Sequence, residues 1–444
     1  MSPKDNRPTE YTPRACLVIF GAFTCAFCTV GFMNSFGIFQ EYYTKNQLSS
    51  SPTSTIAWLG GDSNISFVCY ICWSRSNAGY FWANGKDTLL IVGKETNNPF
   101  EQLMVYVGSF GCVFALMMTS LCHEFYQFLL AQGVVLGISM GMATWPMLAL
   151  VGQYIKVKRA AAMGIVLGGS SLGGIIWPIA IDRLINHPNI GFPWTMRIVG
   201  FIMIPCFTFS CAVAKSPKKA TTNAESRDLN QARGENTTEQ KDAPQSHKVE
   251  ALALWRKPSL QLLCLAMFII YFGMFAPFFY TTSYAVGKGF STSLAFYTVS
   301  IVNGASFFGR VLPGIVADKY GKFNCCIVAT IASGIIAMCW TKVTSVTGLV
   351  IWSAAYGFAS GGILSLQQAC AAQVATPSTL GLAIGTVSAS TALSAMANVP
   401  ISGALVERYG HVSLSMFSGA SLLLGGVLLI AARLSQNRQL RAII

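Results

Sequence analysis

Residues 309–322 read Gly-Arg-Val-Leu-Pro-Gly-Ile-Val-Ala-Asp-Lys-Tyr-Gly-Lys, and they place four charged side chains and a glycine turn between two apolar stretches. One apolar run begins near residue 294, and another extends from residue 323 to residue 340. Crossing a bilayer as a helix takes about 20 residues, and each run approaches or exceeds that length. The segment therefore predicts two membrane-spanning helices joined by a short charged loop.

Five residues of this segment fit the pattern G-x-x-x-D-[RK]-x-G-[RK], namely Gly314, Asp318, Lys319, Gly321 and Lys322. A glycine allows a neighbouring helix to approach closely, and we expect the Asp318 carboxylate to accept hydrogen bonds from the start of another helix. Gly321 permits a left-handed turn, and the two lysines hold the loop on the cytosolic side. We expect this loop to gate a conformational change; the alternative is a generic charged loop.

This pattern resembles the cytosolic loop signature that members of the major facilitator superfamily carry between helices 8 and 9 of twelve. The composition agrees with a membrane protein, because the 444 residues are 53% hydrophobic and 11% charged. Soluble domains carry about 25% charged residues. We therefore expect an all-α polytopic membrane protein with the major facilitator fold, in which two six-helix bundles supply twelve spans around a midplane site.

The chain divides into a cytosolic tail (1–14), an N-terminal bundle (15–214), a disordered cytosolic linker (215–257), a C-terminal bundle (258–433) and a cytosolic tail (434–444). The predicted spans of the first bundle are about 15–39, 56–82, 103–122, 126–151, 160–181 and 195–214. Those of the second are about 260–282, 294–317, 324–341, 346–369, 380–404 and 412–433. Lys and Arg concentrate in the tails, the linker and two loops, so both termini are predicted to be cytosolic, with the plasma membrane as the expected location.

Several function classes find no support in the sequence. The net charge of +13 falls largely in loops and tails, and no Lys/Arg stripe alternates with aromatic residues, so nucleic acid is not an expected partner. Cys69 and Cys72 form a single CxxC with no second pair at zinc spacing, so we expect no metal. No nucleotide-binding motif is present, and we expect neither a cofactor nor an enzyme activity.

The second span is atypical, because Asp62 and Arg75 lie where a membrane helix is required and charge in lipid is costly. A polar insert at 94–102 then separates two apolar stretches that would join into one run. We interpret residues 61–107 as unspliced or frame-shifted sequence, the alternative being a genuine extra loop after a degraded span. Sequencing the transcript tests this: a message that reads continuously through these codons and yields a transporting protein would contradict the interpretation.

Further stretches resemble the monocarboxylate-porter branch of the superfamily in its fungal form: 31–43, 129–133, 162–164, 169–174, 276–280 and 294–297. In those porters an arginine in span 8, four residues before a glycine, is implicated in binding the substrate carboxylate, and Arg310 and Gly314 keep that spacing. Arg310 lies eight residues before Asp318, or about 12 Å into the membrane at helical rise. The alternative is that Arg310 snorkels to the cytosol or braces the loop. Ser306 stands where the porters have an aspartate, which weakens the expectation of proton coupling.

Other candidate substrate-binding side chains are polar residues within predicted spans or at the end of one: Asn34, Asn303, Tyr280, Tyr284 and Gln367. For each, the alternative is a packing contact or a hydrogen bond between helices. The resulting prediction is a monomeric, secondary active or facilitative transporter that moves a small organic acid or metabolite by alternating access, with export of a secondary metabolite as one expected role. Open alternatives are an uptake permease for a monocarboxylate or vitamin, a membrane sensor that does not transport, and a nonfunctional mis-spliced product.

Overall fold

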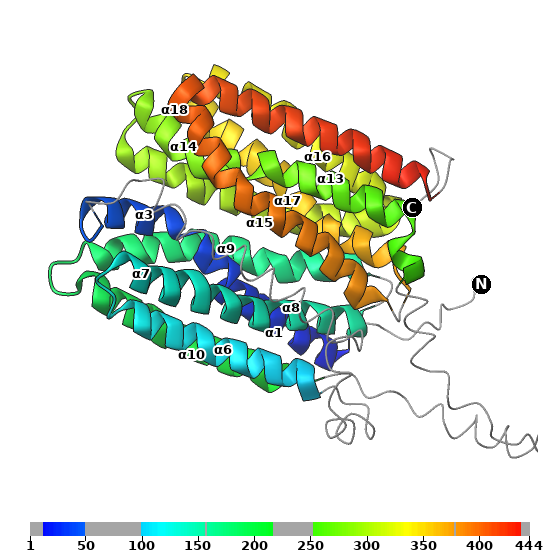
Figure 1. The fold of residues 1–444 in the computed structure, drawn as a ribbon, viewed down its shortest axis with the longest axis horizontal. Helices are drawn as coiled ribbons and strands as arrows, with labels where there is room; N and C mark the ends of the chain where they lie inside the picture. Colours follow the sequence, from blue (N-terminus) through cyan, green and yellow to red (C-terminus); the bar gives the residue numbers. More distant parts are fainter. Residues whose placement is uncertain (1–11, 49–98, 156–157, 216–251, 377–378, 437–444) are drawn as a thin grey trace, which may run out of the picture.

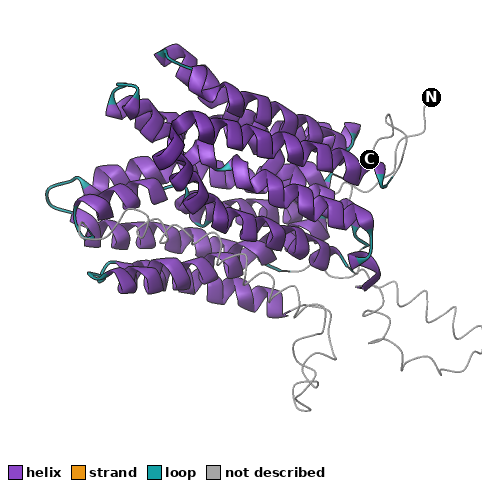
Figure 2. Cartoon of the chain, turned by 45° about the horizontal axis from the view of Figure 1, so that its top comes forward, coloured by secondary structure: helices purple, strands orange, loops and turns teal. Residues whose placement is uncertain are grey.

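The computed structural model describes residues 12–48, 99–155, 158–215, 252–376 and 379–436. In these ranges the chain is helical apart from short connections, and Figure 2 shows helices and loops without a strand in the described part. An apolar chain in lipid requires this, because a helix satisfies its own backbone hydrogen-bonding groups. The expectation of an all-α membrane protein is confirmed to this extent.

The helices form two layers, with the blue-to-green helices of the first half lying beside the green-to-red helices of the second (Figure 1). The first half contains α1 (Pro13–Cys28), α2 (Val30–Met33), α3 (Phe36–Lys45), α6 (Pro99–Thr119), α7 (Phe125–Phe128), the π-helix η2 (Leu129–Leu136), α8 (Gly137–Tyr154), α9 (Arg159–Ile185) and α10 (Gly191–Val213). The second contains α13 (Pro258–Met274), α14 (Ala276–Gly287), α15 (Thr292–Tyr320), α16 (Lys322–Cys339), the 3-10 helix η3 (Trp340–Lys342), α17 (Val346–Val374) and α18 (Leu380–Leu434).

Buried apolar side chains follow the same division. One cluster of buried residues lies between Ala15 and Ala214, and a second lies between Leu254 and Ala432 with Ala160 added from the first half. Each half therefore has its own core of buried apolar side chains.

Ten helical segments within the described ranges are long and apolar enough to cross a membrane. The predicted spans 380–404 and 412–433 both fall on α18, whose backbone leaves helical geometry at Gly410, where φ is 75°. The predicted second span, 56–82, and the interpretation of residues 61–107 lie largely outside the described residues. Every other predicted range overlaps a described helix, and the total of twelve spans stays a prediction.

The end of the predicted linker belongs to the folded second half. Residues 252–255 are helical, and the Leu254 side chain is buried within the second core. The interior of the linker, like most of both tails, lies outside the described residues. The second half therefore begins a few residues earlier than the boundary predicted at residue 258.

Contacts show which helix ends lie together. Asp318, near the end of α15, bonds to the start of α9, and Arg433, at the end of α18, donates to Asn324 at the start of α16. Helices α1 and α9 run parallel, since Gly169 packs on Phe23 and later residues keep the same register. The start of α1 and the end of α18 therefore lie at the end that carries the 318–322 turn, and we call this the loop end.

Candidate functional site

The two halves meet along a seam between α9 and α15, where glycines bring the backbones together. Gly164 of α9 packs directly against the carbonyl oxygen of Arg310, and a Cβ atom on Gly314 of α15 would lie 2.7 Å from the carbonyl oxygen of Ala160. Gly168 packs on the ring of Phe307. Close contact of this kind depends on the missing side chains, as small residues allow in membrane helices. The seam extends from the loop end to the middle of both helices.

Asp318 closes the loop end of this seam. Its Oδ1 accepts a hydrogen bond from the backbone N–H of Ala160 (3.2 Å), and its Oδ2 accepts one from that of Ala161 (3.0 Å). Both donors are N–H groups of the first turn of α9, which have no acceptor within their own helix. The helix dipole favours an anion at this position. The expectation that Asp318 binds the start of another helix is confirmed, and that helix belongs to the other half.

The rest of the turn supports this contact. Gly321 has a φ of 97°, which favours glycine, and it separates α15 from α16. Lys322 lies close enough to Asp318 and Arg159 to interact with both, while Lys319 is exposed with its Nζ 5.5 Å from the centre of the Tyr320 ring. A gating role for the whole turn stays a prediction, because one conformation is described.

Replacing Asp318 with asparagine tests the gating role. The amide keeps one acceptor oxygen but loses the charge that interacts with the α9 dipole, a contribution of about 0.5–1 kcal/mol. We expect turnover to fall about two- to fivefold with an unchanged half-saturating substrate concentration, measured as initial transport rates at equal amounts of protein. A changed affinity with unchanged turnover would count against the gating role.

Arg310 lies on the same seam, about three turns from the loop end. The residue is only 4% exposed, and its Nη1 donates to the carbonyl oxygen of Leu167 (2.6 Å) and to Oγ of Ser170, both on α9. The side chain therefore reaches across to the other half rather than snorkelling to the loop end. Within the described ranges Arg310 forms no ion pair, and its Nε has no hydrogen-bond partner.

Two asparagines lie on the same seam, farther from the loop end. Nδ2 of Asn34, at the break between α2 and α3, donates to Oδ1 of Asn303 on α15 (3.3 Å) and to the carbonyl oxygen of Ser170 (3.5 Å). Gly174 leaves the space for both amides, because a Cβ atom there would lie 2.6 Å from Oδ1 of Asn303. Asn34, Ser170, Asn303 and Arg310 form a polar group that joins the two halves, and we call it the interhalf cluster.

The other predicted site residues lie within the second half. Gln367 on α17 is buried near Tyr271, which also interacts with Arg310. Tyr284 lies apart from the cluster at the end opposite the loop end, where its hydroxyl donates to the carbonyl oxygens of Thr341 (3.2 Å) and Val343 (2.9 Å). Its hydrogen bonds and its ring contact with Trp340 give it a packing role there.

The Tyr280 hydroxyl lies beside Gly403 on α18, within the second half. The prediction missed two residues near Arg310: Ser170 and Tyr271. Ser170 stands in a run rich in glycine and serine that reads as packing, and Tyr271 stands in a long apolar run. The polar hydroxyls inside apolar helices were the available signal.

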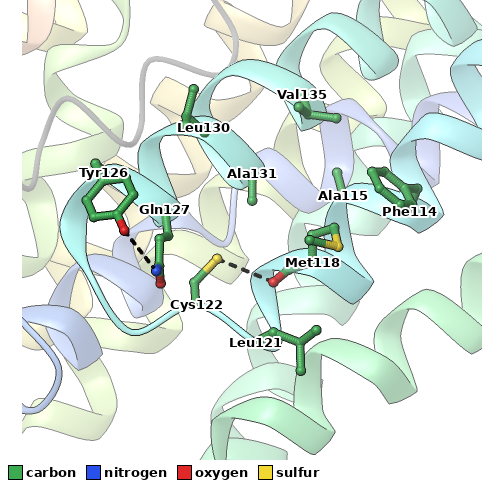
Figure 3. A pocket seen from close by; sticks show the side chains of 10 residues that line it. All are labelled: Phe114, Ala115, Met118, Leu121, Cys122, Tyr126, Gln127, Leu130, Ala131 and Val135. Atoms are coloured by element: carbon green, nitrogen blue, oxygen red, sulfur yellow. Dashed lines mark hydrogen bonds between the residues drawn. The ribbon is translucent and has the colours of Figure 1, made fainter.

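A separate groove of about 380 Å³ lies between the end of α6 and the segment formed by α7 and η2 (Figure 3). Its ten lining residues include no charged side chain, and several of them are exposed on the outer surface of the bundle, including Phe114, Leu121 and Leu130. Such a lining suits hydrocarbon rather than an ionised solute. The groove is therefore distinct from the interhalf cluster, where cationic and amide groups gather.

Long apolar helices arranged in two halves around buried polar groups define a polytopic membrane protein of the transporter type. The family model described as Major Facilitator Superfamily matches residues 102–346. The chain belongs to this superfamily.

Curated relatives agree. An MFS-type transporter of Aspergillus fumigatus is 42% identical over 427 residues, covering 96% of this chain and 93% of the relative. The agnestins efflux protein of Paecilomyces divaricatus is 39% identical, with 96% and 89% covered. The aspyridones efflux protein of Emericella nidulans is 35% identical, with 95% and 78% covered. The crystal structure of the human organic anion transporter MFSD10 is similar in fold, with a TM-score of 0.62, 16% identity, and 95% of this chain and 100% of that one covered.

Proposed function

We propose that this transporter exports a small organic acid, a secondary metabolite, and that Arg310 holds the ionised group of its substrate. The observation that carries the proposal is a buried guanidinium that forms no ion pair with a described residue. A charge in a low-dielectric interior is costly unless a counter-ion compensates it. An anionic substrate at the interhalf cluster supplies that compensation.

The geometry of the guanidinium suits a carboxylate. Nη1 of Arg310 donates a hydrogen bond to α9, whereas the edge of the guanidinium that carries Nε makes no hydrogen bond to a described residue. This edge presents two parallel N–H groups, which is the arrangement that binds a carboxylate or a similar anion bidentately. The proposed placement in the monocarboxylate-porter-like branch agrees with this role.

The substrate would alter the contact between the halves, because Arg310 belongs to α15 and donates to α9. An anion bound at the guanidinium partly neutralises its positive charge. The attraction between Arg310 and the Leu167 carbonyl oxygen is therefore weaker when substrate is bound. Opening of the α9–α15 seam would then expose the site to the loop end, and closing would bury it again. This is alternating access by the rocking of two bundles around one site.

The charges at the two ends support a cytosolic loop end. At the loop end lie Arg14, Lys158, Arg159, Lys215, Arg256, Lys257, Lys319, Lys322 and Arg433, and at the opposite end lie Arg183, Arg197, Lys288, Lys342 and Arg408. Positive residues favour the cytosolic side. We propose on this basis that both termini are cytosolic. We propose separately that the protein works as a monomer in the plasma membrane.

The names of the relatives favour export over uptake, since two of them are efflux proteins of secondary metabolites. Deleting the gene in the organism that carries it, followed by mass spectrometry of cells and medium, tests the direction. We expect at least one acidic metabolite to accumulate in the deletion cells and to fall in their medium. An unchanged distribution would contradict transport of an acid, and retention of the acid in the medium would show uptake instead.

A further inference from the structure

A second set of buried polar groups lies beside Arg310 within the second half. Gln367 on α17 is 4% exposed, and its Oε1 lacks a hydrogen-bond partner among the described residues. Tyr271 on α13 is 2% exposed, and its hydroxyl interacts with both the Gln367 amide and the Arg310 guanidinium. The Tyr271 hydroxyl therefore lies near both the Gln367 amide and the buried cation.

The packing of α15 on α17 places Gln367 at nearly the depth of Arg310. The two helices run parallel in close contact, since Gly357 packs on the carbonyl oxygen of Val302 and, four residues later on both helices, Gly361 packs on that of Ser306. Continuing four residues along both helices brings Arg310 level with residue 365. Gln367 lies two residues further along α17, or about 3 Å nearer the loop end at helical rise.

The Nε edge of Arg310 and Oε1 of Gln367 need opposite kinds of hydrogen-bond partner. The free edge of Arg310 donates and therefore binds anionic oxygen atoms, whereas Oε1 of Gln367 can only accept. A buried acceptor without a donor carries a desolvation penalty that a ligand O–H or N–H removes. A ligand that satisfies both groups carries an ionised acid and a hydrogen-bond donor close together.

We propose that Arg310, Tyr271 and Gln367 form one selective site for organic acids that carry an O–H or N–H donor beside the ionised group, and that Gln367 sets this preference. The inference rests on the proposed function, because it requires Arg310 to hold the acid. It adds a substrate class and two residues that distinguish such acids from simple ones.

The neighbouring glutamine provides a matched control. Gln368 is also buried, and its Oε1 likewise has no partner among the described residues, but its Nε2 donates to Oγ of Ser388 on α18 (3.4 Å), which turns the side chain toward the contact between α17 and α18. Successive residues of a helix point about 100° apart, so the two amides face different helices. Leucine is similar in size to glutamine. Either replacement therefore removes one amide group from the same turn of α17 at nearly constant side-chain volume.

The test is binding of three probes to the purified full-length protein: benzoate, 3-hydroxybenzoate and 3-methoxybenzoate. Ligand-dependent thermal stabilisation gives the affinity of each probe, and the midpoint without ligand shows that each variant folds. We expect the wild type to bind 3-hydroxybenzoate about tenfold more tightly than 3-methoxybenzoate, as for one hydrogen bond to a buried acceptor. Gln367→Leu should lose this preference, and Gln368→Leu should keep it.

The outcomes separate this inference from the proposed function. If the wild type binds the hydroxyl and methoxy probes equally, or if Gln367→Leu keeps the preference, the inference is wrong. If in either case Arg310→Ala still abolishes benzoate binding, the role of Arg310 in the proposed function stands. If none of the three probes stabilises the wild type, both the inference and the anion-binding role of Arg310 are contradicted.

Discussion

Arg310→Ala should abolish transport of an acidic substrate while leaving the protein in the membrane at normal amounts. The change removes the cation that compensates the ionised group of the substrate in a buried site. Losing one partner of a buried, hydrogen-bonded charge pair costs about 2–5 kcal/mol, so the transport efficiency should fall about 100-fold or more. Transport into vesicles, normalised to the amount of protein, measures the effect.

Two further variants make this result specific. Arg310→Lys keeps the charge but not the edge with two parallel donors, so we expect it to retain only a small part of the activity. Arg183→Ala removes an exposed arginine in the last turn of α9 and should transport like the wild type. Normal transport by Arg310→Ala at a normal surface level would remove the substrate role of this residue.

Gly164→Ala should slow the transport cycle strongly, although it adds one methyl group. The new Cβ atom would meet the backbone carbonyl of Arg310, and backbone cannot move aside as the end of a flexible side chain can. Overpacking of this kind costs about 1–3 kcal/mol, and here it acts against the conformation in which the seam is closed. We expect the turnover to fall about tenfold or more.

Gly304→Ala on α15 is the matched control for this prediction. A Cβ atom at Gly304 would lie 3.6 Å from Cδ1 of Ile175, which is ordinary van der Waals contact. Both variants exchange glycine for alanine within a helix, so effects on helix stability are similar. Equal turnover in the two variants would show that close backbone contact at Gly164 is not needed for the cycle.

The sequence predicted the loop end of the seam well, because its pattern is local. The spacing of Asp318 and Gly321 defines the end of one helix and the start of the next, and both predicted features are present. The partner of Asp318 could not be read from the segment alone. It is the first turn of α9, more than 150 residues away in the chain.

The polar residues inside the helices were harder to predict, since a hydropathy pattern shows depth in the membrane but not which neighbour a side chain meets. Tyr271 lies inside the predicted span 260–282 and Tyr284 lies just beyond its end, yet one is beside Arg310 and the other packs at the far end. Asn34 and Asn303 were predicted individually, and the fold brings them within 3.3 Å of each other across the two halves. Pairing over such separations depends on how the halves dock.

The backbone of α18 leaves helical geometry at Gly410, between the two spans that the sequence predicts. Two spans were predicted where Gly410 interrupts the pattern, and the described chain keeps helical residues on both sides with one change of direction at that glycine. The positive φ there is accessible to glycine at little cost, so the residue marks the turn without needing a loop.

The most direct test of substrate binding through an ionised group is the affinity of the purified wild-type protein for the exported acid and for its methyl ester. The metabolite that accumulates in deletion cells supplies the acid, and titration calorimetry measures both compounds under the same conditions. Esterification removes the negative charge that would pair with Arg310 and changes little else. We therefore expect the ester to bind about 100-fold more weakly or not at all. Equal affinities for the acid and its ester would contradict the claim that Arg310 holds an ionised group.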